Sequence, residues 1–424
     1  MNLKTFNMPQ PLHRGRILCS TSNFPRWAGD STTPFVLHLA QDLQALGWQV
    51  DVLAPHAPGA AYHEQLDGVR VARFRYLWPE YLQTVCYQGG ALINLRRQPL
   101  NQLKLPPLII AQIMAIRQRL RTTRYDLLHS HWILPQGFSG RLACWRLPLP
   151  QVITVHGGDV FGLRGKLLAH FKRAALNAAA AVTVNSSVTE QAVLALGAHC
   201  PRMVRIPMGV TTTAPDSIQQ ATAATLRQHY APDQPLLLFS GRLVEEKGIA
   251  DLLHALALLR PMALKPRLLI AGAGQDRPAL EQLSDQLELQ DQVHFIGWVE
   301  PAALVAYQLA ADVVVAPSRT AANGWVEAQG LSVLEAMAVG TPVIASRCGG
   351  VVDAVAHEHT GLLVAEGQPL QLANAIARLL QDPALARQLS QAALIRVQQY
   401  YSRPASAEAF AGLFAEVMNT RLDV

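Results

Sequence analysis

The alternation of apolar runs most constrains the fold of this chain, because β-rich stretches alternate with helical stretches throughout its length. In the first half, residues 16–22 and 49–55 are predicted strands, and the amphipathic stretch 34–47 between them is a predicted helix that ends at Gly47. Further strands are predicted at 127–132, 151–157 and 180–186. Strands that alternate with helices form parallel sheets built from right-handed crossovers.

The second half starts the same alternation again. Its predicted strands are residues 235–241, 267–274, 292–298, 313–318 and 341–346, and its first helices are 248–260 and 276–289. A chain of 424 residues is also too long for one ordinary core. We therefore predict an α/β protein with two doubly wound, Rossmann-like domains.

The predicted boundary lies in a stretch rich in Pro, Gly, Thr and Ser at residues 205–217. We assign residues 1–205 to the first domain and 206–395 to the second. Residues 396–424 are predicted to form a helix after a break that contains a proline, and this helix could cap either domain.

Charge is divided unequally between the two halves. Residues 1–205 hold 22 Lys and Arg against 9 Asp and Glu, whereas residues 206–424 hold 14 against 21. No acidic residue occurs between Tyr81 and Tyr125, where there are seven basic ones: Arg96, Arg97, Lys104, Arg117, Arg119, Arg121 and Arg124. The first half is therefore expected to face an anionic partner, either a membrane surface or an acidic soluble molecule. We expect no nucleic-acid partner.

The sequence also indicates a compartment. No apolar run approaches the length needed to span a bilayer, and the first residues lack an apolar core followed by a small-residue cleavage site. The five cysteines have no metal-ligand spacing, so we expect reduced thiols, no zinc and a cytoplasmic location.

Two glutamates with seven residues between them, Glu327 and Glu335, lie in an otherwise apolar stretch. One interpretation is a capping box, in which Ser332 caps a helix and Glu335 reaches back to its first amide. The other is a ligand site. Free amides of Gly330, Leu331 and Ser332 at the helix start would bind a phosphate, and a carboxylate one turn inside would accept hydrogen bonds from two ribose hydroxyls.

Other candidates follow predicted strands, where ligands of open parallel sheets bind. Arg242 and Lys247 after Gly241 suit a diphosphate, although Glu245 and Glu246 could instead pair with them in a solvated turn. Gly272-Ala273-Gly274 lacks the third glycine of a dinucleotide loop and favours a tight turn. His131 and His156 end two strands of the basic half, and their spacing alone leaves their roles open.

Taken in order, these stretches resemble the retaining GT-B glycosyltransferases of family 4. The resemblance runs from "FPRWAGD" through "HSHWILPQG", "TVHGGDV", "IPMGV", "FSGRLVEEKG" and "VHFIGWV" to the two glutamates with "GLSVLEAMAVGTPVIAS", and it closes with "CGGVVDAV". It implies two domains facing each other across a cleft, with the basic half as the acceptor domain and the last helix crossing back to it.

The resemblance also implies roles for individual residues. Arg242 and Lys247 would bind the donor diphosphate, assisted by the amides of Gly330 to Ser332. Glu335 would hold the ribose, Glu327 would lie near the transferred sugar, and Trp298 near the base. The remaining implied positions are His131 and His156 lining the cleft, Gly29 beneath the phosphates, and Gly241 and Gly272 in the donor site.

The implied reaction is the loss of a nucleoside diphosphate through an oxocarbenium-like state, with attack from the same face. Its main requirement is charge stabilisation on the leaving group. The resemblance implies no metal, and the sequence has no Asp-x-Asp signature. The chain departs from the family pattern at several positions without losing a charged group that this chemistry needs: Ala28-Gly29, Met208, Thr211, Ala328 to Ser332, and Asp353.

The expected function is therefore transfer of a sugar from a UDP- or GDP-linked donor, without a cofactor. The expected acceptor is a lipid-linked or polysaccharide precursor at the inner face of the plasma membrane, where basic residues would hold the enzyme peripherally. The alternatives are a soluble synthase of a sugar phosphate or disaccharide, and a non-catalytic nucleotide-sugar-binding protein. A dehydrogenase is disfavoured because neither half has a full dinucleotide fingerprint.

Overall fold

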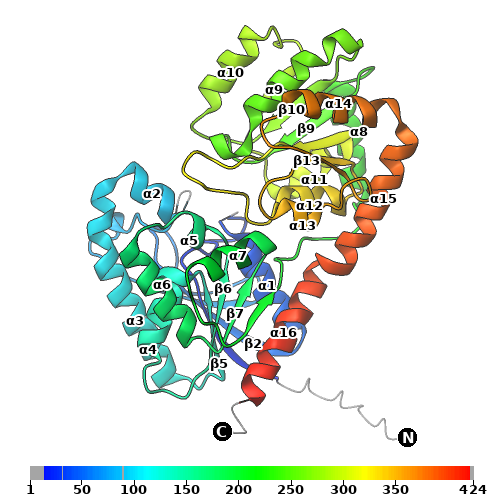
Figure 1. The fold of residues 1–424 in the computed structure, drawn as a ribbon. Helices are drawn as coiled ribbons and strands as arrows, with labels where there is room; N and C mark the ends of the chain where they lie inside the picture. The colour runs from blue at the N-terminus through cyan, green and yellow to red at the C-terminus, as the bar shows by residue number, and fades with distance from the viewer. Residues whose placement is uncertain (1–13, 31, 88–89, 421–424) are drawn as a thin grey trace, which may run out of the picture.

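The computed structural model describes residues 14–30, 32–87 and 90–420. It contains two sheets, one from each half of the chain, in two lobes (Figure 1). The start of the chain, which we expect to carry no export signal, lies outside these residues.

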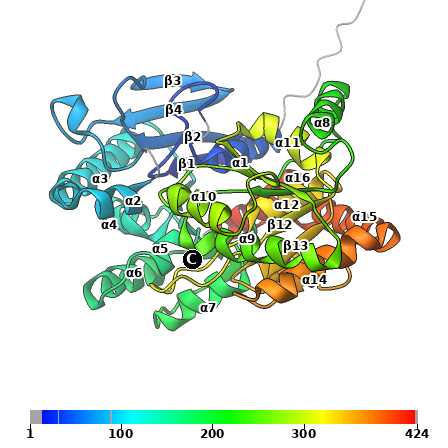
Figure 2. The same ribbon diagram turned by 90° about the horizontal axis from the view of Figure 1, so that it is seen from above.

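The first sheet has the order β3-β4-β2-β1-β5-β6-β7-β8. Its strands are β1 (Gly15–Ser20), β2 (Trp48–Pro55), β3 (His63–Leu66), β4 (Val69–Phe74), β5 (Leu127–His131), β6 (Gln151–Val155), β7 (Ala181–Val184) and β8 (Met203–Arg205). All pairs are parallel except β3 with β4, which form a hairpin at the edge of the sheet (Figure 2). Strands β5, β6 and β7 are buried along their whole length, whereas the edge strand β8 is not.

The helices of this half are α1 (Pro34–Ala45), α2 (Ala91–Arg97), α3 (Leu105–Thr122), α4 (Phe138–Ala143), α5 (Gly158–Phe161), α6 (Lys166–Ala178) and α7 (Ser187–Ala195). Helix α1 occupies the position predicted for residues 34–47 and buries Val36, Leu39 and Leu43 on one face. These residues belong to the core between α1 and strands β1 and β2.

The second sheet is entirely parallel, in the order β11-β10-β9-β12-β13-β14. Its strands are β9 (Leu236–Ser240), β10 (Arg267–Ala271), β11 (Val293–Gly297), β12 (Val313–Ala316), β13 (Val343–Ser346) and β14 (Leu362–Val364). Each of the five strands predicted in this half is present. Because parallel strands end at one edge, the loops after β9, β10 and β12 gather there.

The helices of the second half are α8 (Ser217–Tyr230), α9 (Ile249–Leu258), α10 (Arg277–Gln286), α11 (Pro301–Ala310), α12 (Leu331–Ala338), α13 (Val351–Ala354), α14 (Pro369–Gln381), α15 (Pro383–Tyr400) and α16 (Arg403–Asn419). Two apolar cores, one on each face of the sheet, hold these helices in place. The last of them, α16, packs instead in the core of the first half.

Helix α16 runs from the second lobe to the first (Figure 1). Its buried side chains, among them Phe410 and Phe414, are part of the core that contains β1, β2 and α1. Arg403 at its start forms an ion pair with Asp42 of α1, with Nη2 2.6 Å from Oδ1. The turn before α16 falls at Tyr401 and Ser402, because α15 continues unbroken to Tyr400 and Ser402 caps the new helix.

Within the described residues, no helix combines the length and the apolar character that crossing a membrane requires.

Candidate active site

The centre of the candidate site is an ion pair between two loops at the edge of the second sheet. Lys247 follows β9 and Glu327 follows β12, and Lys247 Nζ lies 2.5 Å from Glu327 Oε2. The other oxygen, Oε1, accepts a hydrogen bond from the Gly330 amide at 3.2 Å. Burial alone would raise the pKa of the Glu327 carboxyl, but Lys247, the Gly330 amide and the charge of Arg242 hold it below its ordinary value.

The start of α12 leaves backbone amides unused. Gly330 is the N-cap, in the left-handed conformation with φ +80°, and no side chain caps the helix. Among the residues that the structure describes, the amides of Leu331 and Ser332 donate to no partner. The capping box at Ser332 is therefore wrong, because the helix begins before this residue and the Ser332 hydroxyl lies inside the first turn.

Glu335 lies one turn into α12, on the same face as Leu331. Its side chain is half-buried, and within the described part of the chain its carboxylate has no hydrogen bond or ion pair. Burial raises the pKa of Glu335 to about 7. A half-buried carboxylate without a protein partner, next to free amides, makes Glu335 a candidate ligand-binding group.

The two cations after β9 differ in their surroundings. Lys247 contacts Glu327, whereas Arg242 is about half exposed and lies 3.4 Å from Glu246. Glu245 lies 3.6 Å from Arg319, a different partner. The solvated-turn alternative therefore describes Arg242 but not Lys247.

The glycine positions in the second half reflect close backbone packing. A Cβ on Gly272 would lie 1.8 Å from the carbonyl oxygen of Gly241, so these two predicted positions are in contact. A side chain at Gly272 would push the loops after β9 and β10 apart. The Gly272 amide donates to the Gly297 carbonyl at 2.7 Å. Trp298, which follows Gly297 at the end of β11, is 56% exposed.

The histidines of the first half form a stacked cluster at the ends of β5 and β6. His131 Nδ1 lies 2.9 Å from His156 Nε2, with the two rings nearly parallel. Burial lowers the pKa of His131 to about 3, and burial together with the His131 imidazole lowers the pKa of His156 well below its ordinary value. Both rings are therefore neutral at physiological pH and can act as hydrogen-bonding groups, but not as cations.

Sequence reasoning missed two residues that support this cluster. The Trp132 ring lies 4.8 Å from His156, and Phe35 contacts both rings. Trp132 has a φ of +74°, which non-glycine residues seldom adopt. Asp159 is buried and accepts a hydrogen bond from the Ile133 amide at 2.8 Å, which fixes the turn after Trp132. Neither role has a local sequence signal, because both depend on contacts between different strands.

One group near the cluster has metal-ligating chemistry. Ligand atoms of Cys19, His129 and His131 lie within 4.8 Å of one another. All three side chains are buried, and burial raises the pKa of the Cys19 thiol to about 12. His129 Nε2 lies 2.7 Å from Thr154 Oγ1, and the His129 ring contacts Phe414 of α16. This environment is that of a neutral, packed core.

The two halves of the candidate site meet where side chains of one half contact glycine backbone of the other. A Cβ on Gly157 would lie 2.4 Å from Cβ of Ala328, so the residue after His156 touches the residue after Glu327. Arg164 Nη2 donates to the Gly324 carbonyl at 2.9 Å, a second contact between the domains. Gly29, in the loop after β1, has open space around it, since a Cβ there would meet nothing within 4 Å.

Comparisons with known proteins identify relatives of both halves. Residues 33–214 match the family model described as Glycosyltransferase Family 4, and residues 224–396 match the model described as Glycosyl transferases group 1. The D-inositol 3-phosphate glycosyltransferase of Pseudarthrobacter chlorophenolicus is 33% identical over 309 residues, which is 68% of this chain and 70% of that protein.

Solved structures share the whole architecture. Sucrose-phosphate synthase from Thermosynechococcus elongatus has a TM-score of 0.78 and 26% identity, covering 96% of this chain and 100% of that one. Anabaena HepE in complex with UDP-glucose, with a TM-score of 0.69 and 20% identity over 96% of this chain and 100% of that one, shows the same fold. The prediction of two Rossmann-like domains in a GT-B arrangement is confirmed, and so is that of a glycosyltransferase. Matched in both halves and across 70% of a relative's length, the chain belongs to glycosyltransferase family 4.

Proposed function

We propose that this glycosyltransferase transfers a sugar, with retention of anomeric configuration, from a UDP- or GDP-linked donor to a lipid-linked or polysaccharide precursor at the inner face of the plasma membrane. The observation that carries the donor half of the proposal is the grouping of the Lys247–Glu327 pair, the free amides of α12 and the unpartnered Glu335. These groups supply a cation and amides for a diphosphate and a carboxylate for ribose hydroxyls.

In this proposal the donor diphosphate replaces Glu327 as the partner of Lys247. A phosphate oxygen and a carboxylate compete for the same ammonium group, and Arg242 is free to turn from Glu246 to the second phosphate. As the glycosidic bond breaks, negative charge grows on the leaving phosphate, and Lys247, Arg242 and the α12 amides stabilise it. Glu327, released from Lys247, is then available to the sugar, and transfer needs neither metal nor cofactor.

Neutral His131 and His156 suit the acceptor side. A neutral imidazole can donate to or accept from a sugar hydroxyl without introducing a charge beside an oxocarbenium-like centre. Their position next to the Gly157–Ala328 contact places them by the Glu327 loop.

The proposed membrane surface is the outer face of α3, on the outside of the first lobe (Figure 1). Ile110 and Met114 are 57% and 66% exposed, and Arg117 and Arg121 continue the same face. Just before the helix, Leu100 and Leu103 are each 75% exposed. Exposed apolar side chains next to arginines, in a segment without acidic residues, are typical of helices that lie on anionic bilayers.

Vesicle pelleting tests the membrane part of the proposal. We expect the protein to pellet with vesicles of phosphatidylcholine and phosphatidylglycerol, and the bound fraction to fall steeply as salt is raised. The double substitution Ile110→Ser/Met114→Ser should weaken pelleting about tenfold, since it removes two exposed apolar side chains from the contact. The matched control Leu370→Ser/Ile395→Ser, at exposed positions of the second domain, should pellet like the wild type. Equal pelleting with neutral vesicles would contradict the proposal.

A second candidate function is transfer to a soluble phosphorylated acceptor. The names of two relatives, a D-inositol 3-phosphate glycosyltransferase and a sucrose-phosphate synthase, favour it. The basic first domain would then attract the acceptor phosphate rather than a bilayer. Absence of vesicle binding together with transfer to a sugar phosphate would select this candidate.

The donor is tested by a thermal-shift panel of UDP, GDP, ADP and their common sugar conjugates, with EDTA present. A ligand that binds the native state raises the melting temperature according to its excess over its dissociation constant. We expect one nucleotide to exceed the others. A response that appears only when divalent metal replaces EDTA would contradict the metal-independent mechanism.

A further inference from the structure

We infer that the acceptor domain positions the Glu327 loop through two residues outside the proposed chemistry, Gln329 and Asp353. The inference rests on the proposed role of Glu327. Both residues lie in the donor domain. Gln329 hydrogen-bonds to a residue that packs in the acceptor-domain core, and Asp353 hydrogen-bonds to the acceptor domain itself. They therefore tie the geometry of the donor site to the arrangement of the two domains.

The first link is the Gln329 side chain. Its Oε1 accepts from the Met208 amide at 3.0 Å, and its Nε2 donates to the Met208 carbonyl at 2.7 Å. Gln329 is 4% exposed, and Met208 packs in the core that contains β1 and α1. A buried amide that satisfies both backbone groups of one residue holds its loop in a single position. That loop runs directly from Glu327 to the α12 start.

The second link is the Asp353 carboxylate. Its two oxygens accept from the amide and the hydroxyl of Ser187, at 2.5 and 2.8 Å. Ser187 is the first residue of α7, in the acceptor domain. The carboxylate therefore lies at the positive end of an acceptor-domain helix, a charge-assisted contact of the stronger kind.

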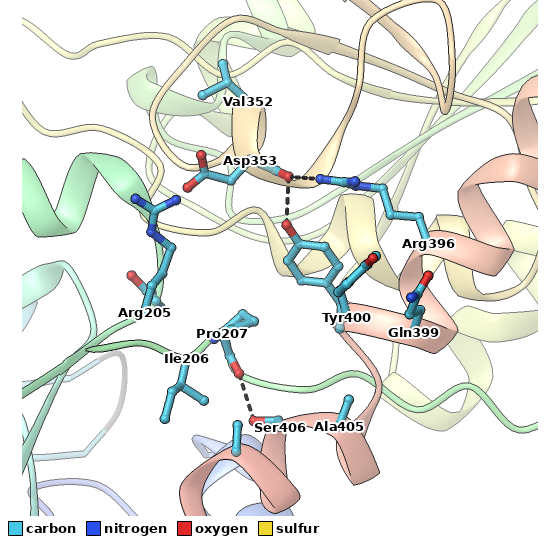
Figure 3. Close-up of a pocket in the computed structure, with 13 residues that line it drawn as sticks. Arg205, Ile206, Pro207, Val352, Asp353, Arg396, Gln399, Tyr400, Ala405 and Ser406 are labelled. Carbon is cyan, nitrogen blue, oxygen red and sulfur yellow. Dashed lines mark hydrogen bonds between the residues drawn. The ribbon is translucent and has the colours of Figure 1, made fainter. Parts of the chain in front are cut away.

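Hydrogen bonds also hold the backbone of Asp353, and the turn before its helix contacts the Glu327 loop. Its carbonyl accepts from Arg396 Nη2 at 2.8 Å and from the Tyr401 hydroxyl at 2.6 Å (Figure 3). The turn that opens its helix, α13, donates from the Gly350 amide to the Glu327 carbonyl at 2.8 Å. A Cβ on Gly349 would lie 1.9 Å from that same carbonyl oxygen, so turn and loop are in direct contact.

A cavity of about 600 Å³ lies beside this link. Arg205, Pro207, Asp353, Arg396 and Ser406 are among the residues that line it (Figure 3). Asp353 therefore meets α7 at the rim of an open space, and its two hydrogen bonds to Ser187 join α13 to α7 there.

The test is hydrogen exchange of the full-length protein without donor, followed in peptides that cover residues 327–334 and 347–354. The decisive variant is Ser187→Pro. Proline is favoured at the first position of a helix, so α7 should persist, but both donors to Asp353 are removed. We expect exchange in these two peptides to become at least about tenfold faster, since hydrogen bonds to charged groups are worth an order of magnitude or more in an equilibrium.

Three further variants extend the design. Gln329→Leu removes the first link and should accelerate the same peptides. Ser187→Ala keeps the amide donor and should have a smaller effect than Ser187→Pro. Asp312→Asn is the matched control, because Asp312 accepts from the Leu236 amide and from Arg227 entirely within the donor domain. It should leave exchange at residues 327–334 unchanged.

Unchanged exchange of residues 327–334 in Ser187→Pro would overturn the inference. If this variant instead loosens α7 itself, Asp353→Ala removes the same bonds from the opposite side, and its effect on residues 327–334 decides in the same way. The readout needs no donor, so failure of the nucleotide panel would count against the proposed function alone, and failure here against the positioning role alone.

Discussion

At the scale of single residues, the donor half of the site is defined by one satisfied and one unsatisfied carboxylate. Glu327 has Lys247 and an amide as partners, which keeps it ionised, whereas burial without a partner raises the pKa of Glu335 to about 7. The sequence predicted that both glutamates matter, but not this difference. Which side chains surround a carboxylate depends on loops from different strands, and residue spacing does not contain that information.

The unsatisfied carboxylate should lower stability in the absence of ligand. The folded state retains a proton on Glu335 up to about pH 7, whereas the unfolded state loses it near 4.5, so this group's contribution to the free energy of unfolding falls as pH rises through that window. Glu335→Gln should therefore raise the free energy of unfolding at pH 8 by an amount on the order of 2 kcal/mol. Urea unfolding at pH 8 and pH 4.5 measures this, and the gain should disappear at the lower pH.

The same substitution should weaken binding of the nucleotide that the thermal-shift panel selects, by about tenfold, because a charge-assisted hydrogen bond to the ribose is lost. Isothermal titration calorimetry gives the comparison. A variant that is stabilised but binds as tightly as the wild type would show that Glu335 does not contact the nucleotide.

At the scale of elements, the sequence predicted most strands of both sheets, because buried parallel strands carry continuous apolar runs. It missed the hairpin of β3 and β4, although Asp67-Gly68 joins them with positive φ at both residues, a common signal for a two-residue turn. For the start of α12 it left two interpretations open, and the structure contradicts the capping box. A serine followed by a glutamate three residues later fits a capping box, but Gly330 had already begun the helix from the left-handed conformation.

The two glycines that flank α12 allow a controlled test of its start. Gly330 and Gly340 both have a φ of +80°, but a Cβ at Gly330 would lie 2.9 Å from Val351, whereas a Cβ at Gly340 would meet nothing within 4 Å. Gly340→Ala should cost about 1 kcal/mol of stability from backbone strain alone. Gly330→Ala should cost about 1–3 kcal/mol more than this control and should also weaken nucleotide binding, because the amides shift. Equal effects of the two substitutions would show that the Val351 side chain moves aside without a measurable cost.

At the scale of the molecule, the sequence predicted two domains and their charge difference, but not how the domains meet. The Gly157–Ala328 contact, Gln329 with Met208, and Asp353 with Ser187 all join residues that are far apart in the chain. No periodicity or motif encodes such pairs, because they depend on the docking of two independently patterned sheets. The composition of the last helix suits either domain, and only the family resemblance implied that it crosses back to the first.

The packing of α16 predicts a domain-specific effect of a mutation near the end of the chain. Phe414 is fully buried in the core of the first domain, so Phe414→Ala should cost that domain about 3–5 kcal/mol. Calorimetry should show the transition of the first domain at a lower temperature, with nucleotide binding by the second domain retained below it. Ile395→Ala, on an exposed face of α15, is the control and should change little. A single transition that moves as a whole would show instead that the two domains unfold together.

The crossing of α16 also has a consequence for folding during synthesis on the ribosome. Side chains that complete the first core, such as Phe410 and Phe414, are synthesised after the whole second domain. Roughly 200 residues lie between β8 and α16. At about 5–20 residues per second, the ribosome therefore completes α16 some 10–40 seconds after β8. During that time the part of the β1 and β2 face that α16 covers in the finished protein is not yet covered by this helix. The domain that is translated first is therefore the one that finishes folding last.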